Sequence, residues 1–302
     1  MTIRQLAAAA AVPGALLFVV GMRAAPVAAP DVNAMLHHRI KHVFIIYQEN
    51  RSFDNEFGTF PGADGVWSAD ARTHGFAQTE PVTGHTVTPF RITDPDVFYE
   101  SNERAVQIQA FNGLRMNQFV RAQEEHEKSH HPTNKQLISV GEESMYHIDC
   151  DTIPLLWAYA KRFTLFDNFH QALRGPSTPS NIEIIAAQNG LTQLARHPSQ
   201  QAPAVDKPGL PVFTDLDPAF GPYNSADHSA VRQIDLTYAN LLLTMERGQT
   251  KRVTNDTDDI RLDERVIARL GPAAIPWRWY QEGFTSPDHA GFIAHHAAPQ
   301  YF

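Results

Sequence analysis

Residues 40–65 read IKHVFIIYQENRSFDNEFGTFPGADG and carry most of the information on the fold. The apolar run at 43–47 has the length and β-branched content of a strand buried on both faces. Glu49 and Asn50 follow where that strand would end. Open α/β sheets bind ligands at the carboxyl ends of their strands, and carboxylate and amide oxygens suit hard or borderline divalent cations. These residues predict a metal site at a strand end. A polar strand exit with Asx turns is the alternative that two adjacent side chains leave open.

The whole stretch resembles the N-terminal signature of the bacterial phosphoesterase family that contains phospholipases C and acid phosphatases. The matching motifs are Glu-Asn-Arg-Ser-Phe-Asp at 49–54, Phe-Gly at 57–58 and Pro-Gly-x-x-Gly at 61–65. This resemblance implies an α/β/α sandwich with a mostly parallel sheet, of the alkaline-phosphatase-like type. It also implies that Glu49 and Asn50 bind a divalent metal ion of unknown identity. The implied substrate is a small-molecule or phospholipid phosphate ester.

A second segment with candidate chemistry runs from 163 to 190. The apolar residues 163–166 predict a short buried strand, and Gly-Pro-Ser-Thr-Pro at 175–179 predicts a turn before a helix that stops at Gly190. A helix N-terminus favours an anion, such as a phosphoryl group or an alkoxide. Helix capping by Thr178 or Ser180 is the alternative, and it leaves Ser177 unused. The family carries its Ser or Thr nucleophile in a Gly-Pro-Ser/Thr-x-Pro context, so the resemblance implies that Ser177 is the nucleophile and a third metal ligand.

The third segment is the pair His295-His296. Among fifteen histidines such a pair can arise by chance. It follows IPWRWYQEG at 275–283, however, which resembles the family's Trp-x-x-Tyr-x-Glu-Gly segment and its later His-His. The resemblance places both histidines in the active site, where an imidazole can bind phosphate oxygens or protonate a leaving alkoxide.

The N-terminus predicts export. Arg4 precedes an uncharged apolar run from Leu6 to Gly21, and small residues follow, so residues 1–29 are interpreted as a signal peptide of a secreted or periplasmic protein. An uncleaved membrane anchor is the alternative. Residues 30–302 then form the N-terminal portion of a phosphoesterase domain. Family relatives continue into a segment that supplies further carboxylate ligands, and this chain ends at Phe302 before any such segment. We therefore expect a truncated chain with little activity.

Composition narrows the partners. The 302 residues are 43% hydrophobic and carry a formal charge of −8, which argues against a general affinity for nucleic acid. Transient contact with a membrane surface is compatible with a phospholipid substrate, and the sequence leaves the oligomeric state open. Two alternatives to a phosphate esterase remain, a catalytically inactive truncated homologue and a sulfatase- or phosphonate-type hydrolase of the same superfamily.

The rest of the chain carries further structural expectations. These are a helical stretch within 105–127, a helix at 153–161, a solvated helix face at 124–127, Cys150 as a small core residue, a long surface excursion at 198–224, and regular structure at 234–245 and 259–270.

Overall fold

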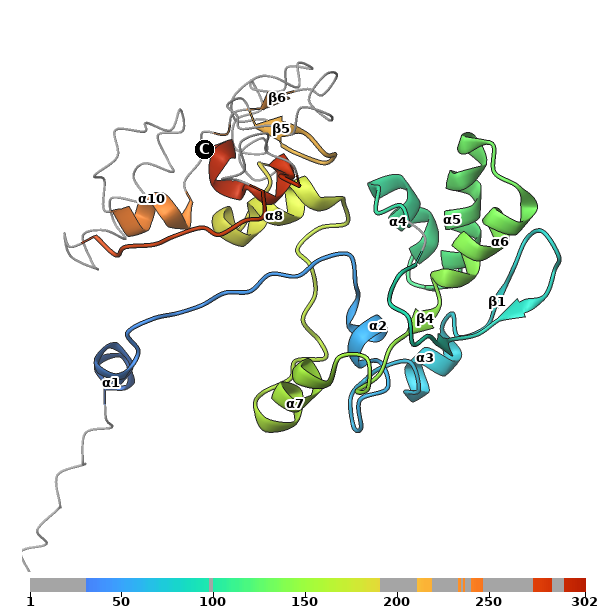
Figure 1. Ribbon diagram of the computed structural model, residues 1–302, viewed down its shortest axis with the longest axis horizontal. Helices are drawn as coiled ribbons and strands as arrows, with labels where there is room; N and C mark the ends of the chain where they lie inside the picture. The colour runs from blue at the N-terminus through green and yellow to red at the C-terminus, as the bar shows by residue number, and fades with distance from the viewer. Residues whose placement is uncertain are drawn as a thin grey trace, which may run out of the picture. The chain divides into compact units, whose positions relative to one another are not determined.

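The computed structural model describes residues 31–97, 100–190, 211–218, 233–234, 236, 240–246, 274–283 and 291–302. The chain divides into two units, Met1–Tyr47 and Gln48–Phe302, and each is described by itself. The predicted signal peptide, the regular structure expected at 259–270 and most of the excursion at 198–224 lie outside the described residues. The helices, several of which are labelled in Figure 1, are α1 (Val32–Arg39), α2 (Phe53–Phe57), α3 (Ala69–Thr73), α4 (Arg104–Phe111), α5 (Phe119–Glu127), η1 (Lys128–His130), α6 (Asn134–Glu143), α7 (Pro154–Arg162), α8 (Ser177–Ala186), α10 (Leu241–Glu246), η3 (Ala294–His296) and η4 (Ala298–Tyr301).

The first unit contains α1 and an extended apolar segment. Asp31 begins the helix by accepting a hydrogen bond from the backbone N–H of Ala34 at 3.2 Å. The segment that follows is not a buried strand, so this prediction was wrong. Phe44 and Ile46 are 84% and 85% exposed, and no described strand pairs with residues 43–47. A strand of this composition is stable only between neighbouring strands with both faces covered, and the described residues supply neither.

The strands form three two-stranded sheets. These are β1 (Gln78–Thr79) antiparallel to β2 (Thr86–Val87), β3 (Phe90–Arg91) parallel to β4 (Tyr146–His147), and β5 (Asp217–Pro218) parallel to β6 (Gln233–Ile234). The molecule is therefore a mixed helix and strand structure, compatible with the α/β class. The described residues contain no larger parallel sheet. The short buried strand predicted at 163–166 is also wrong, because Phe163 and Phe166 are 64% and 69% exposed and belong to no strand.

Helix α5 packs against both α4 and α6 (Figure 1). Val106 and Ala110 of α4 form an apolar cluster with Ala122 of α5. The helical stretch predicted within 105–127 is confirmed as two helices. Asn112 takes a left-handed conformation with φ 44° and ends α4. Met116, with φ 52°, lies in the connection and does not share a helix face with the residues of α5.

The helix predicted at 153–161 is confirmed as α7. Proline stands at its start, where the missing N–H costs nothing. Trp157 is buried and joins α7 to α2. Its indole N–H donates to the backbone oxygen of Glu56 at 2.9 Å, and its ring stacks on Phe57 with centroids 6.3 Å apart.

Helix α8 and the C-terminal segments share a second core. Its buried residues are Ile182, Ile185, Val212, Leu216, Leu236, Ala298, Tyr301 and Phe302. The helix ends at Ala186 because Ala187 is left-handed, with φ 54°. It therefore stops before Gly190, the residue at which the sequence predicted its end. This core positions the first residue of α8 and the histidines of η3, because both η3 and η4 pack against α8.

Two polar predictions were also wrong. Cys150 is exposed and is not a core residue. Glu124 is fully buried, so the stretch 124–127 is not a uniformly solvated face. The reason is that α5 packs against both β1 and α6. The Glu124 side chain lies beside Gly141 of α6 and close to Glu80.

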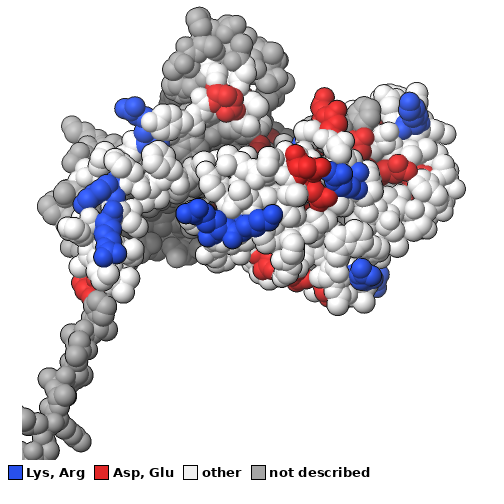
Figure 2. Space-filling model, turned by 60° about the horizontal axis from the view of Figure 1, so that its bottom comes forward, with Lys and Arg blue, Asp and Glu red and all other residues white. Residues whose placement is uncertain are grey.

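Lys and Arg side chains on the face shown in Figure 2 stand among Asp and Glu side chains, as is usual for a solvated surface. Within the described part of the chain, no helix has both the length and the apolar character that crossing a bilayer requires.

Candidate active site

The carboxylate of Glu49 joins three segments that are far apart in the sequence. Its Oε1 atom accepts a hydrogen bond from the hydroxyl of Ser177 at 3.1 Å. The same oxygen lies 2.7 Å from Nε2 of His296. The side chains of Glu49 and His296 are 20% and 25% exposed, and Ser177 is buried. Three of the five residues predicted for the site are therefore in direct contact, largely withdrawn from solvent.

Helix α8 places Ser177 at its first position. Pro176 precedes it as the N-cap residue and offers no side-chain cap. The N–H of Thr178 donates to Oδ1 of Asp215 at 2.8 Å. The helix start thus attracts an anion, as expected, but the anion on this N–H is a carboxylate of the chain itself. The capping roles considered for Thr178 and Ser180 are wrong, because the helix begins before both residues.

The histidine pair lies on η3, and its two rings contact each other edge to face with centroids 4.9 Å apart. Glu49, His295 and His296 each offer one ligand atom, and these three atoms lie within 4.8 Å of one another. Two imidazoles and one carboxylate suit a borderline divalent cation such as zinc or iron(II). The donor set around Glu49 therefore fits the divalent metal that the family resemblance implies.

The electrostatics of the three groups differ. Burial acts to raise the pKa of Glu49, but the hydrogen bond and charge of His296 and the hydrogen bond of Ser177 outweigh it, so this pKa is lowered. The hydrogen bond to Glu49 raises the pKa of His296 to about 9, against burial and with help from Glu282. Burial lowers the pKa of His295, and the charge of Asp215 opposes this only in part. Near neutral pH a carboxylate, an imidazolium and a neutral imidazole therefore lie side by side.

Asn50 follows Glu49 in the chain but turns elsewhere. Its backbone is left-handed, with φ 66°, a conformation that asparagine tolerates better than most residues. Its side-chain oxygen accepts a hydrogen bond from Nδ2 of Asn102 at 3.2 Å. The structure thus pairs the Asn50 carboxamide with Asn102, while Glu49 contacts Ser177 and His296. The role of Asn50 as a metal ligand stays a prediction.

The rest of the signature has structural roles around Glu49. The guanidinium of Arg51 donates to the Tyr146 hydroxyl and, at 2.7 Å, to the backbone oxygen of Pro95. Ser52 and Asn55 form the capping box that begins α2. Nδ2 of Asn55 also donates to the backbone oxygen of Tyr146 at 2.8 Å. These contacts anchor the chain to β4 immediately after Glu49 and so hold the carboxylate in place.

Sequence reasoning missed two residues at the site. Glu282 approaches His296, with Oε1 2.8 Å from Nδ1, and Asp215 binds the start of α8. Glu282 lies in the segment at 275–283 that already resembled the family, which was a usable signal. Asp215 lies in the stretch 198–224 that was expected to be a surface excursion, and nothing in its local sequence indicates a contact with residue 178.

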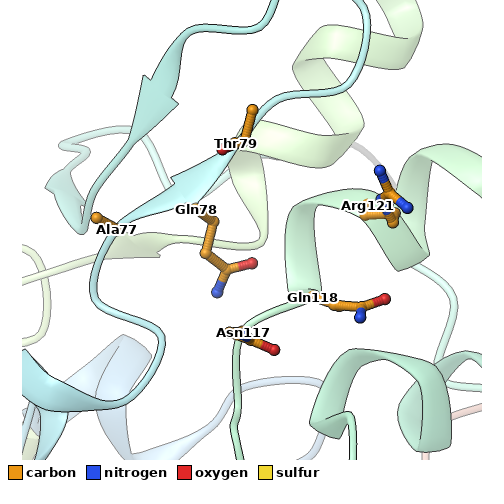
Figure 3. Close-up of a pocket in the computed structure, with 6 residues that line it drawn as sticks. All are labelled: Ala77, Gln78, Thr79, Asn117, Gln118 and Arg121. Atoms are coloured by element: carbon orange, nitrogen blue, oxygen red, sulfur yellow. The ribbon is translucent and has the colours of Figure 1, made fainter.

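A separate hollow of about 280 Å³ lies where β1 meets the start of α5. Figure 3 shows the Gln78 amide directed into this space toward Asn117 and Gln118. That amide is already engaged, because its oxygen accepts from the backbone N–H of Val120 at 3.2 Å. The lining residues are Ala77, Gln78, Thr79, Asn117, Gln118 and Arg121. They include no carboxylate and no histidine, so this hollow lacks the groups that serve as a general base or as metal ligands in hydrolysis.

Two comparisons with known proteins bear on these residues. A family model described as the Phosphoesterase family matches residues 40–301. The hemolytic phospholipase C of Pseudomonas aeruginosa is 26% identical over 167 residues, which make up 55% of this chain and 21% of that protein. The chain therefore aligns with about a fifth of the length of this relative.

Proposed function

Since the chain belongs to the phosphoesterase family, we propose that it hydrolyses phosphate esters with Ser177 as the nucleophile. The observation that carries the proposal is the shared oxygen of Glu49, which contacts both the Ser177 hydroxyl and the His296 ring. A hydroxyl at a helix start, oriented by a carboxylate and close to a cationic imidazole, has the surroundings that a phosphate ester needs. The alkaline-phosphatase-like sandwich and export through residues 1–29 belong to the same proposal.

The roles of the side chains follow from their charges. The lowered pKa of Glu49 means that its carboxyl group stays ionised and is a weak base. It therefore orients the Ser177 hydroxyl and is available as a metal ligand. The oxygen of Ser177 attacks phosphorus, the bond from phosphorus to the ester oxygen breaks, and the proton lost by Ser177 leaves on that oxygen as part of the alcohol. Water then cleaves the phosphoseryl bond, which releases phosphate and returns a proton to the Ser177 oxygen. His296, as an imidazolium, stabilises the charge on the phosphoryl oxygens. Neutral His295 completes the group that surrounds Glu49.

A divalent metal is part of the proposal. Glu49, with Ser177 and with Asn50 or the histidines, would hold it. When bound, such an ion lowers the pKa of a coordinated hydroxyl and polarises a phosphate ester. The resemblance favours Asn50 as the second ligand. Glu49, His295 and His296 also offer ligand atoms within 4.8 Å of one another, and His296 would bind a metal only as a neutral imidazole, in place of its role as an imidazolium.

The substrate class is a phosphate monoester or a phosphodiester such as a phospholipid headgroup linkage. The name of the aligned relative supports the phospholipid alternative. Turnover of p-nitrophenyl phosphate, bis(p-nitrophenyl) phosphate and p-nitrophenyl phosphorylcholine separates these alternatives, because the first is a monoester and the other two are diesters.

The test of the nucleophile is Ser177→Ala in the full chain, with added divalent metals. We expect turnover to fall on the order of 10⁴-fold or more, because the covalent step is lost, while the circular dichroism spectrum stays that of the parent. Ser180→Ala is the matched control on the same helix, since its hydroxyl donates to the backbone oxygen of Pro176 at 3.1 Å. Turnover in Ser177→Ala equal to that of the control would refute the assignment.

A further inference from the structure

His296 is held at both ring nitrogens by carboxylates. Nε2 lies 2.7 Å from Oε1 of Glu49, and Nδ1 lies 2.8 Å from Oε1 of Glu282. An ionised carboxylate can accept hydrogen bonds but cannot donate them. The ring therefore donates in both directions and lies on a line between the two acidic groups.

Glu282 reaches the ring from a separate segment that is tied to η3. The side-chain amide of the preceding Gln281 donates to the backbone oxygen of Ile293 at 2.6 Å. Gly283 follows with φ 64°, so the chain turns directly after Glu282 in a conformation that glycine adopts without strain. The position of the Glu282 carboxylate is thus fixed relative to the short helix that carries His296.

We propose that Glu282 is a positioning residue for the hydrolysis proposed above, on which this inference rests. By accepting a hydrogen bond from Nδ1–H of His296, it fixes the imidazole plane so that Nε2 faces the oxygen of Glu49 that also accepts from Ser177. The second nitrogen of a catalytic or ligating histidine commonly needs such an acceptor to set its orientation.

The position of Glu282 makes the test clean. Its side chain is 55% exposed, whereas that of Glu49 is 20% exposed. An exposed ion pair contributes little to global stability. Substitution of Glu282 should therefore change the orientation and hydrogen bonding of the His296 ring without unfolding the chain.

The experiment compares Glu282→Ala and Glu282→Gln with the parent in the full chain. The side-chain nitrogen and N–H resonances of His296 report its hydrogen bonds directly. We expect the hydrogen-bonded Nδ1–H signal to disappear in Glu282→Ala. It should persist in Glu282→Gln, whose amide oxygen can still accept a hydrogen bond from Nδ1–H. With p-nitrophenyl phosphate, we expect kcat to fall about tenfold in Glu282→Ala with KM nearly unchanged, and Glu282→Gln to restore most of it.

Glu127→Ala is the matched control, because Glu127 accepts from Nδ1 of His130 at 3.2 Å on the surface. It should alter the His130 signal and leave turnover at the parental value. An unchanged Nδ1–H signal of His296 in Glu282→Ala, or parental kcat in that variant, would overturn the inference. If the parent itself turns over none of the esters, the proposed function fails, and the His296 signal alone still decides whether Glu282 positions the ring.

Discussion

A single carboxylate oxygen, Oε1 of Glu49, accepts from Ser177 and also faces Nε2 of His296. Substituting Glu49 therefore removes the acceptor of both groups at once. We expect Glu49→Ala to lower the affinity for added zinc or manganese at least tenfold, on the order of losses seen when even an outer partner of a ligand is removed. Elemental analysis after dialysis at fixed free metal measures this. Equal metal content in Glu49→Ala and in Glu125→Ala, an exposed glutamate on α5, would contradict the metal assignment.

The proximity of site residues was predictable from the sequence where a motif contained them, and their catalytic roles stay predictions. Glu49, Ser177 and His296 were chosen from three separate segments, and the structure places them in contact. Glu282 and Asp215 were not chosen, because their roles exist only through partners 14 and 37 residues away. An ordinary acidic residue in a turn has no local feature that distinguishes a surface position from a contact with the site.

At the scale of elements, the region of β1, α5 and α6 contains a buried pair of carboxyl groups, Glu80 and Glu124. Both side chains are fully buried. Glu80 accepts from the N–H of Thr83 at 2.7 Å and from its hydroxyl. Neither oxygen of Glu124 has a donor among the described residues, so a protonated Glu124 that donates to Glu80 is the arrangement that satisfies both groups.

This pair makes stability depend on pH. Burial, together with the hydrogen bond and charge of Glu80, raises the pKa of Glu124 from 4.5 to about 8, with Glu142 adding to the rise and Lys128 opposing it. Burial acts to raise the pKa of Glu80, but the hydrogen bonds from Thr83 and Val82 lower it to about 2.

We expect the free energy of unfolding to fall as pH rises from about 4.5 to about 8. In this window the folded chain keeps a proton on Glu124 that the unfolded chain has released, so the slope is negative, at up to about 1.4 kcal/mol per pH unit. Glu80 acts in the opposite sense at lower pH, between about 2 and 4.5.

The variant Glu124→Gln keeps a donor to Glu80 but cannot ionise. It should therefore flatten the dependence of the unfolding free energy on pH and exceed the parent in stability at pH 8. Urea unfolding at several pH values measures this, with Glu125→Gln on the same helix as control. A parental slope in Glu124→Gln would exclude the pair as its source.

Elements with local signals were predictable, and those that need distant partners were not. Helix α7 follows its proline and its apolar spacing and was found as expected. The apolar run at 43–47 has an equally clear pattern, yet it is exposed, because a strand depends on neighbours that its own sequence does not supply. Glu124 was misinterpreted for a related reason. The acidic run around it is typical of a solvated face, and only the packing of α5 against α6 and β1 shows that one member is buried.

At the scale of the whole molecule, the described residues contain separate apolar cores. Helix α8 packs with η3, η4 and α10, whereas α5 packs with α4, α6 and β1. The links between α4 and the turn before α8 are hydrogen bonds and a cation–π contact, in which the Arg174 guanidinium lies 4.7 Å from the ring centre of Phe111. Arg104 donates to the backbone oxygen of Arg174 at 2.7 Å, and Gln107 donates to that of Gly175 at 3.1 Å. Damage to one core should therefore reach the other only weakly.

Tyr301 tests this separation. It is fully buried in the core of α8, and its hydroxyl donates to the backbone oxygen of Leu216. Tyr301→Ala should destabilise that core by about 3–5 kcal/mol, because it removes a large buried ring. Tyr301→Phe keeps the ring and should cost only about 1–2 kcal/mol, since it removes one buried hydrogen bond to the Leu216 oxygen, which still accepts from the Thr178 hydroxyl at 3.4 Å. Hydrogen exchange resolves the two cores. In Tyr301→Ala the amides of α8 should exchange faster, while the amides of α5 and α6 keep their parental rates. Turnover should also be lost, because Ser177 and His296 are both held by this core. A uniform acceleration across α5, α6 and α8 would mean that the cores unfold as one cooperative unit, so that substitutions far from Ser177 would change activity through global stability alone.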